Sequence, residues 1–169
     1  MPAYRVIAIP DEIAHAVRTT GSSPRYGHPA HSEVALGYGP CRHCLRTFAV
    51  GTDRRILFTY DPFADTDPLP LPGPVFIHES VCARYPEDAG FPEDLRQHAL
   101  RLNAYAHGRR LRALEYVGDG DVEPVIDRLL GQADVDYIHV RDTEAGCYDF
   151  RIERADASRV LSPGEPSSC

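Results

Sequence analysis

Two segments near the end of the chain, residues 135–141 and 147–153, alternate apolar and polar side chains more regularly than any other part of the sequence. Successive side chains of a β-strand point to opposite faces, so this alternation predicts two strands that each bury one face. Residues 142–146 between them are short enough to close a hairpin. The chain is therefore expected to contain an antiparallel sheet. The side chains predicted to face its core are Ile138, Val140, Tyr148, Phe150 and Ile152.

The register of this hairpin decides which polar side chains share its other face. The simplest pairing opposes Arg141 to Cys147 and His139 to Asp149, with Arg151 at the next position on the same face. That face then carries a thiol, an imidazole, a carboxylate and two guanidinium groups. The hairpin is therefore a candidate place for a functional site.

The remaining apolar segments predict further strands and a few helices. Short apolar runs bounded by Gly, Pro or Asp are typical of strands, and apolar positions spaced by three and four residues are typical of amphipathic helices. We therefore expect an α+β fold with a mainly antiparallel sheet of about seven or eight strands and about two or three helices. The expected strands are 4–9, 45–50, 55–60, 74–78, 100–106 and 110–117, and the helical segments are 11–18, 92–97 and 122–130, the last capped by residues 119–121.

The chain length of 169 residues predicts one domain with a sizeable core. The sequence contains no internal repeat and no sign of a second core, so we predict a single α+β domain over residues 1–161. Two long connections interrupt it: a loop at 21–39 and a proline-stiffened connector at 62–74. Residues 162–169 are polar and are predicted to form a disordered tail that contains Cys169.

Charge and residue usage exclude several classes of function. The formal net charge of −7 disfavours nucleic acid or an anionic membrane as partner. All 18 basic residues are arginine, so a pyridoxal phosphate bound to lysine and a P-loop nucleotide site are both excluded. The N-terminus carries no export signal, and no apolar run approaches the roughly 20 residues of a membrane span. We expect a cytoplasmic protein whose partner is a small-molecule ligand, and the sequence indicates no particular oligomeric state.

Residues 41–46 place two thiols, an imidazole and two guanidinium groups side by side. Cys41 and Cys44 have the spacing of a metal-binding knuckle, and His78 and Cys82 offer a second pair of ligands. Three thiolates and one imidazole suit a tetrahedral zinc ion. Two features argue against this hypothesis, because no glycine follows Cys44 and a long connector separates the two pairs. Zinc is thus one of several alternatives for these residues.

A reactive thiol is the second hypothesis. Basic residues lie beside Cys41, and an arginine is expected opposite Cys147, and such neighbours lower the pKa of a thiol and favour its nucleophilic form. An imidazole at His139 held by Asp149 would act as a general acid or base. Under this hypothesis Cys41, Cys147, His139 and Asp149 are the catalytic residues. The alternative is that His139 and Asp149 form a cross-strand pair without a catalytic role.

A third hypothesis concerns the arginines. The guanidinium group binds carboxylate or phosphate through two hydrogen bonds at once. Arg42, Arg141 and Arg151 could therefore converge on a small anion and form a substrate-binding clamp. Arginines without such a role are also common on protein surfaces.

The chain contains six short motifs, at residues 39–42, 57–63, 73–78, 137–141, 146–148 and 151–154. Together they resemble the bacterial domain-of-unknown-function family 1203, with the resemblance running from about residue 37 to residue 155. The resemblance implies a stand-alone bacterial protein and carries no assigned activity. It places Cys41, Arg42, His139, Arg141 and Cys147 in the family pattern, but not Cys44 or Cys82.

Two functions remain in competition on these grounds. The leading hypothesis is a small bacterial protein that acts on a small, anionic molecule at a Cys/His/Arg site through thiol- or metal-assisted chemistry. The alternative is a zinc-stabilised binding or interaction module without catalysis, held by Cys41, Cys44, His78 and Cys82. The sequence does not identify a substrate or decide whether the protein is an enzyme.

Overall fold

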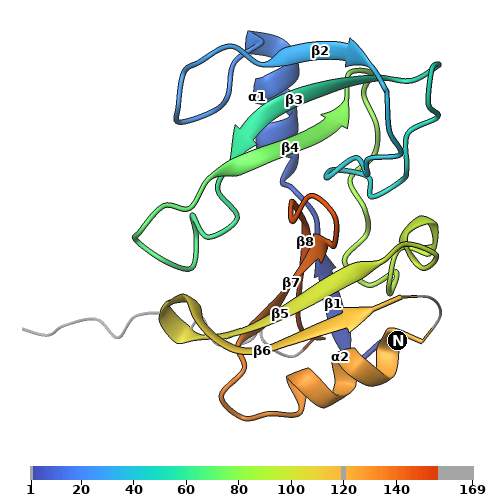
Figure 1. The fold of residues 1–169 in the computed structure, drawn as a ribbon. Helices are drawn as coiled ribbons and strands as arrows, with labels where there is room; N and C mark the ends of the chain where they lie inside the picture. Colours follow the sequence, from blue (N-terminus) through green and yellow to red (C-terminus); the bar gives the residue numbers. More distant parts are fainter. Residues whose placement is uncertain (1, 119–120, 156–169) are drawn as a thin grey trace, which may run out of the picture.

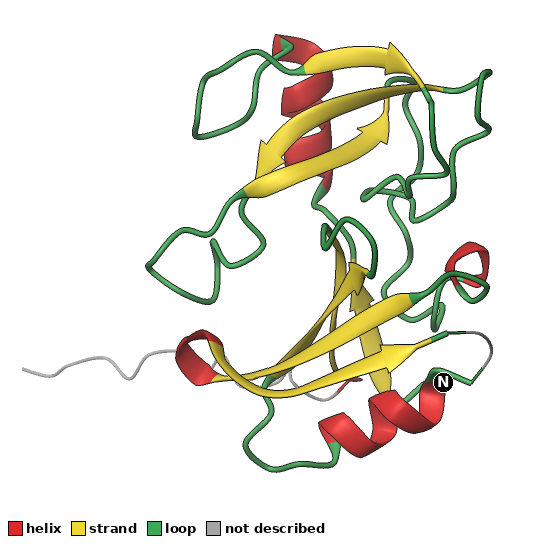
Figure 2. Ribbon diagram, in the orientation of Figure 1, coloured by secondary structure: helices red, strands yellow, loops and turns green. Residues whose placement is uncertain are grey.

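A computed structural model describes residues 2–118 and 121–155 and contains eight strands in two antiparallel sheets, together with two α-helices. Figure 1 shows the smaller sheet with helix α1 in one half of the molecule and the larger sheet with helix α2 in the other. Figure 2 shows that loops account for much of the chain between these elements. The expected α+β class with mainly antiparallel strands is confirmed.

The larger sheet has five strands in the order β1-β8-β7-β5-β6. One face packs on α2, where Ile126 and Leu129 meet Ile138 and Phe150 in the main hydrophobic core. The hairpin expected around residues 107 and 108 is present as β5 and β6. The elements of this half are β1 (Tyr4–Ile7), β5 (Leu100–Ala106), β6 (Arg110–Val117), α2 (Glu123–Leu130), β7 (Tyr137–Asp142) and β8 (Tyr148–Arg154), with 3₁₀ turns η1 (Glu93–Leu95) and η2 (His107–Arg109).

The smaller sheet has three strands in the order β2-β3-β4 and its own core. Helix α1 turns Ala14 and Val17 toward Phe58 and Ile77 of this sheet, so its apolar stripe is buried as amphipathic spacing requires. The chain thus has two main cores, where the sequence suggested only one. The elements of this half are α1 (Asp11–Thr20), β2 (His31–Val34), β3 (Arg54–Tyr60) and β4 (Gly73–His78).

Two expectations about this half are wrong. Strand β2 lies inside the segment 21–39, which we expected to be a loop throughout. Residues 45–50 form turns and irregular backbone in place of a strand. The partners of β3 are therefore β2 and β4, and not residues 45–50. Leu45 and Phe48 are buried in the cores without forming a strand, because burial alone does not require one, whereas Val50 is 60% exposed.

The predicted register of the last hairpin is also wrong. Arg141 lies opposite Tyr148 and Val140 opposite Phe150, so Asp149 is an extra residue that forms a β-bulge. His139 consequently lies opposite Arg151 and has no cross-strand pairing with Asp149. The bulge turns the Tyr148 ring to the face that carries His139, and the two rings are 4.9 Å apart.

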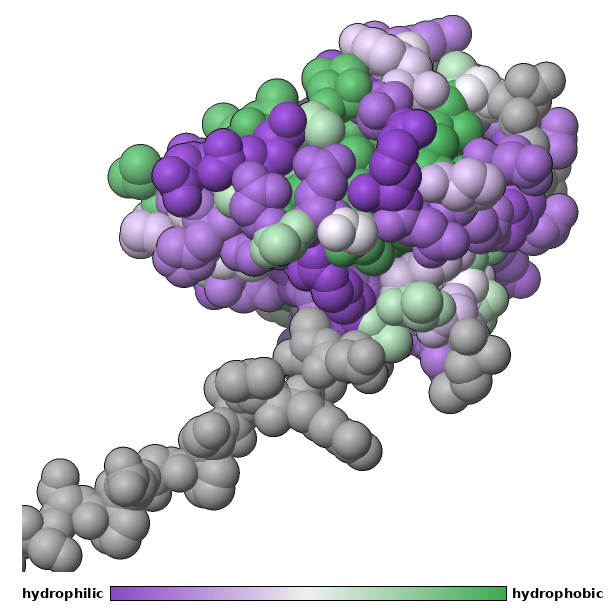
Figure 3. All heavy atoms as spheres, turned by 90° about the horizontal axis from the view of Figure 1, so that it is seen from below, coloured by the Kyte–Doolittle hydropathy of each residue, from purple (hydrophilic) through white to green (hydrophobic). Residues whose placement is uncertain are grey.

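The surface is of the ordinary mixed kind. In the view of Figure 3, hydrophilic side chains predominate and hydrophobic ones occupy smaller areas between them. Within residues 2–118 and 121–155, no helix is long and apolar enough to cross a membrane. Helix α2 begins after Val122 without a side-chain cap, while residues 119 and 120 of the expected cap lie outside the described residues, as does the expected tail at 162–169.

Candidate metal centre

Four side chains from two separate segments meet beside the smaller sheet. The ligand atoms of Cys41, Cys44, His78 and Cys82 all lie within 4.8 Å of one another. The Cys41 and Cys82 sulfurs are 3.9 Å apart, and the Cys44 sulfur is 3.4 Å from Nδ1 of His78. The two pairs expected from the sequence therefore come together, and the cluster could hold a metal ion.

These spacings match those around a tetrahedral ion. With Zn–S bonds of about 2.3 Å and Zn–N bonds of about 2.0 Å, two sulfur ligands lie about 3.8 Å apart and a sulfur and a nitrogen about 3.5 Å apart. The observed 3.9 Å and 3.4 Å agree with both values. These two donor–donor distances are therefore compatible with tetrahedral coordination.

The knuckle forms although no glycine follows Cys44. Leu45 takes the left-handed conformation itself, with φ of +57°, and its amide donates to the Cys41 carbonyl at 2.8 Å. This conformation costs a non-glycine residue roughly 1 kcal/mol. The side chain of Leu45 is only 1% exposed, and we attribute the tolerance of this conformation to that burial. The missing glycine therefore does not count against a knuckle.

The β3–β4 pairing brings the second pair of ligands to the first. His78 is the last residue of β4 and lies opposite Arg55 near the start of β3. The amide of Arg42 donates to the Phe76 carbonyl at 2.9 Å, and the amide of His78 donates to the Cys41 sulfur at 3.3 Å. The connector between the pairs is thus the loop of a hairpin, and its length does not keep them apart.

An outer layer of polar groups orients the His78 ligand. Nε2 of His78 lies 3.4 Å from the Asp53 carboxylate, which also accepts a hydrogen bond from the Ala49 amide at 2.8 Å. A carboxylate on the far ring nitrogen favours the tautomer whose other nitrogen is free to bind a metal ion. The sequence offered no signal for this role of Asp53, because the contact depends on how the turn after the knuckle folds.

A second outer group surrounds the Cys82 sulfur. Arg18 of α1 donates to this sulfur at 3.3 Å and also to the His78 carbonyl at 3.0 Å. His43 places Nδ1 3.3 Å from the same sulfur and Nε2 2.8 Å from the carboxylate of Asp11. Both ends of α1 are therefore connected to the cluster, a role that the sequence did not indicate for Arg18 or Asp11.

The cluster shifts the pKa values of its own members strongly. Burial raises the pKa of the Cys41 thiol, while hydrogen bonds from Cys41 and then Cys44 lower the pKa of Cys82. Hydrogen bonding to Cys44, followed by that to Cys82, raises the pKa of His78 to about 10. Protons and metal ions compete for such ligands, so metal binding at this cluster releases protons.

Arg42 points away from the cluster and joins the two halves of the molecule. Its guanidinium donates to the Tyr148 carbonyl at 2.9 Å and to the Pro40 carbonyl at 2.6 Å, and it pairs with Asp149 at 3.0 Å. Burial raises the pKa of Asp149 to about 7, although the Arg42 charge opposes this shift. Arg42 is thus engaged with three partners inside the protein.

His139 lies in the larger sheet and does not contact Asp149. Its side chain is fully buried, and neither ring nitrogen has a hydrogen-bond partner among the described residues. Burial, followed by the charges of Arg141 and Arg151, holds the pKa of this imidazole well below its usual value. The expected orientation of His139 by Asp149 is therefore wrong, because the bulge carries Asp149 to Arg42 instead.

The other expected site residues are spread over different surroundings. Arg141 donates to the Gly146 carbonyl at 3.0 Å, and Arg151 binds both oxygens of Asp65 at 2.8 and 2.9 Å. Cys147 shares a cavity of about 180 Å³ with Arg141, and its sulfur lies 4.0 Å from the Ala145 carbonyl. The three arginines of the expected clamp thus each have a partner of their own.

The fold and the site together define a class: an α+β protein of two antiparallel sheets with a cluster of three cysteines and one histidine beside the smaller one. The sequence profile of a family described as Protein of unknown function (DUF1203) matches residues 38–154, which include all four members of the cluster. The chain belongs to this family. No match was found among curated proteins or among solved structures.

Proposed function

We propose that Cys41, Cys44, His78 and Cys82 bind a zinc ion that stabilises the fold, and that the protein is a zinc-stabilised binding module. The observation that carries the proposal is the meeting of three sulfurs and one nitrogen within 4.8 Å of one another, with two of their distances, 3.9 Å and 3.4 Å, suited to a tetrahedral zinc ion. The carboxylate of Asp53 behind His78 adds support, because metal-bound histidines usually have such a partner.

The donor set favours zinc over other ions. Thiolate and imidazole ligands in a tetrahedral arrangement are typical of Zn²⁺, whereas Ca²⁺ and Mg²⁺ prefer oxygen ligands. Four protein ligands fill the coordination sphere of zinc and leave no position for a substrate. This supports a stabilising role in preference to a catalytic one.

The position of the cluster supports the same role. The core of the smaller sheet includes the cysteines themselves, so part of its packing depends on how they are held. A metal at this point would cross-link the knuckle to the end of β4, and through Arg18 it would also fix α1. The free energy of metal binding then becomes free energy of folding.

The thiol hypothesis has less support. A Cys41 that binds metal is not available as a nucleophile, and Arg42 is already paired with Asp149. Binding of a small molecule is a separate matter, because it does not need these residues.

The test is elemental analysis of the purified full chain and of two matched variants. The wild type is expected to contain about one zinc ion per chain, and Cys44→Ser is expected to lose it. Cys147→Ser removes a thiol outside the cluster and should keep the metal. A wild type without metal, or metal lost with Cys147 and kept without Cys44, would overturn the proposal.

A further inference from the structure

A third, small core lies under the loop that joins β3 to β4, residues 61–72, here called the covering loop. It consists of Phe63, Tyr105 and Tyr137 and is separate from the two main cores. Phe63 is fully buried, with its ring centre 4.5 Å from that of His139 and 5.3 Å from that of Tyr105. The covering loop thus inserts one aromatic ring into a box of other rings.

The floor of this box contains polar atoms that the protein leaves without partners. Both ring nitrogens of His139 and Oδ1 of Asn103 are buried and have no hydrogen-bond partner among residues 2–118 and 121–155. Each such atom costs about 1–3 kcal/mol when it replaces a hydrogen bond to water. Several of them in one place indicate a site whose polar groups are meant for another molecule.

The covering loop is held over the box by an ion pair of unequal burial. Arg151 binds both oxygens of Asp65, and the Arg151 side chain is 11% exposed whereas that of Asp65 is 65% exposed. Asp65 can therefore turn into water at low cost. Arg151 cannot, and although its Nε stays paired with Glu153 at 2.8 Å, its two terminal nitrogens would need another anion if Asp65 left.

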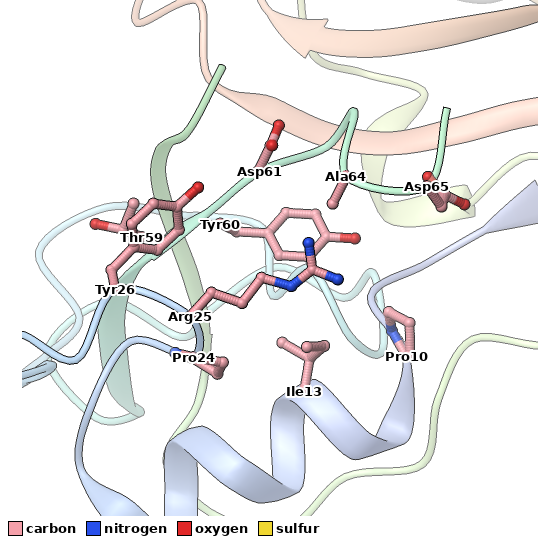
Figure 4. Close-up of a pocket in the computed structure, with 10 residues that line it drawn as sticks. All are labelled: Pro10, Ile13, Pro24, Arg25, Tyr26, Thr59, Tyr60, Asp61, Ala64 and Asp65. Atoms are coloured by element: carbon pink, nitrogen blue, oxygen red, sulfur yellow. The ribbon is translucent and has the colours of Figure 1, made fainter. Parts of the chain in front are cut away.

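Three cavities are lined in part by the covering loop. One of about 170 Å³ is lined by Arg25, Tyr60 and Asp65, and Figure 4 shows Arg25 reaching across it in front of the Tyr60 ring. A second, of about 180 Å³, is lined by Pro62 and Tyr148, and a third, of about 430 Å³, by Asp65 and Tyr137. The covering loop thus forms part of the wall of all three cavities.

We propose that the covering loop occupies a ligand site in the place of its ligand, and that this site binds a small aromatic carboxylate. The ligand ring would take the position of Phe63 between Tyr105 and His139, and its carboxylate would replace that of Asp65 on Arg151. The unpartnered nitrogens of His139 would then hydrogen-bond to a polar group on the ligand.

The chemical class of the ligand follows from the contacts that the covering loop loses when the ligand replaces it. Removing the fully buried Phe63 ring from the box costs about 2–3 kcal/mol of hydrophobic free energy, so an occupant without a ring would leave that loss uncompensated. The guanidinium of Arg151 favours a planar carboxylate that accepts two hydrogen bonds. Neither requirement involves the metal cluster, so this inference is independent of the proposed zinc site.

The test is calorimetric titration of the full chain with 3-phenylpropanoate. Two further probes are butanoate, which lacks the ring, and 3-phenylpropan-1-ol, which lacks the charge. Asp65→Asn removes the competing carboxylate and should tighten binding of 3-phenylpropanoate about tenfold. Asp136→Asn is the matched control, because Asp136 lines the same cavity but has no contact with Arg151 among the hydrogen bonds and ion pairs of the described residues.

Two further readouts identify the place of binding. Arg151→Gln added to Asp65→Asn should abolish binding, and the imidazole resonances of His139 should shift only when 3-phenylpropanoate is bound. The inference is overturned if 3-phenylpropanoate binds no variant, if butanoate binds equally well, or if Asp136→Asn tightens binding as much as Asp65→Asn. Because Asp65→Asn changes an exposed side chain, it tests the inference even if the Arg151 variant fails to fold.

Discussion

The guanidinium of Arg42 lies 3.0 Å from the carboxylate of Asp149, and both side chains are almost completely buried, at 3% and 1% exposed. Arg42 belongs to the knuckle and Asp149 to the bulge of β8, so this ion pair joins the proposed metal centre to the larger sheet. Pairs of this kind are sensitive to the loss of one member, because the other is left as an isolated buried charge.

We therefore expect Arg42→Gln to lower the free energy of unfolding by about 3 kcal/mol. Arg112→Gln is the matched control, because its pair with Asp134 is 39% and 56% exposed and should contribute less than about 1 kcal/mol. Urea denaturation of the metal-loaded proteins measures both values. Equal losses of unfolding free energy in the two variants would show that the buried ion pair stabilises the protein no more than the exposed one.

Removal of the metal should destabilise the protein strongly. A chelator is expected to lower the melting temperature of the wild type by more than about 10 °C, because metal binding contributes directly to folding. Cys147→Ser should show the same drop, whereas Cys44→Ser should melt at the lower temperature with or without chelator. A wild-type melting temperature that does not change when chelator is added would contradict a stabilising metal.

The contacts around Cys82 should control how firmly the metal is held. Arg18→Gln and His43→Gln each remove a polar contact to its sulfur, and we expect metal affinity to fall about tenfold in each. His15→Gln serves as control, because His15 lies on α1 like Arg18 but is not a member of the cluster. The affinities are measured by competition with a chromophoric chelator, and unchanged values in both variants would exclude this outer layer from metal binding.

Burial of neutral His139 should make stability depend on pH. Its pKa is lowered in the folded state, so the unfolded chain takes up a proton below about pH 6.5 that the folded protein does not. Stability from this group is therefore complete above that pH and is lost as the pH falls, by about 1.4 kcal/mol per pH unit. The groups facing it are four aromatic rings and the guanidiniums of Arg141 and Arg151.

The measurement is the difference in unfolding free energy between the wild type and His139→Phe as the pH is lowered from about 6.5 to about 5. The raised pKa of Asp149 acts in the opposite direction. The folded protein binds a proton at this carboxyl at a higher pH than the unfolded chain does, so this group stabilises the fold as the pH falls. That contribution is present in both proteins and cancels in the difference. Parallel pH profiles would mean that His139 does not titrate differently in the folded and unfolded states.

Local patterns in the sequence were sufficient for most of the elements. The helix beginning at Asp11, the hairpin of β5 and β6 and the alternation of β7 and β8 could all be predicted, because each depends on residues close in the chain. The pairing of Cys41 and Cys44 with His78 and Cys82 could be predicted as a possibility from ligand chemistry. Whether the two pairs meet could not, since that depends on a hairpin whose loop is long.

The register of the last hairpin shows what local patterns leave out. Alternation continues on both sides of a bulge, so nothing in the residues 147–153 reveals that Asp149 is unpaired. That single extra residue sends Asp149 to Arg42 and leaves His139 under Phe63, and the expected catalytic pair is lost with it.

The sequence by itself determined the class of fold, the position of its short-range elements and the candidate ligands of the Cys/His cluster, because propensity, periodicity and ligand type are properties of neighbouring residues. Only the tertiary structure decided the division into two sheets, the partners of the buried arginines and the box beneath the covering loop. These depend on contacts between distant segments, and in such contacts the free energy of burying a charge or a ring selects the partner.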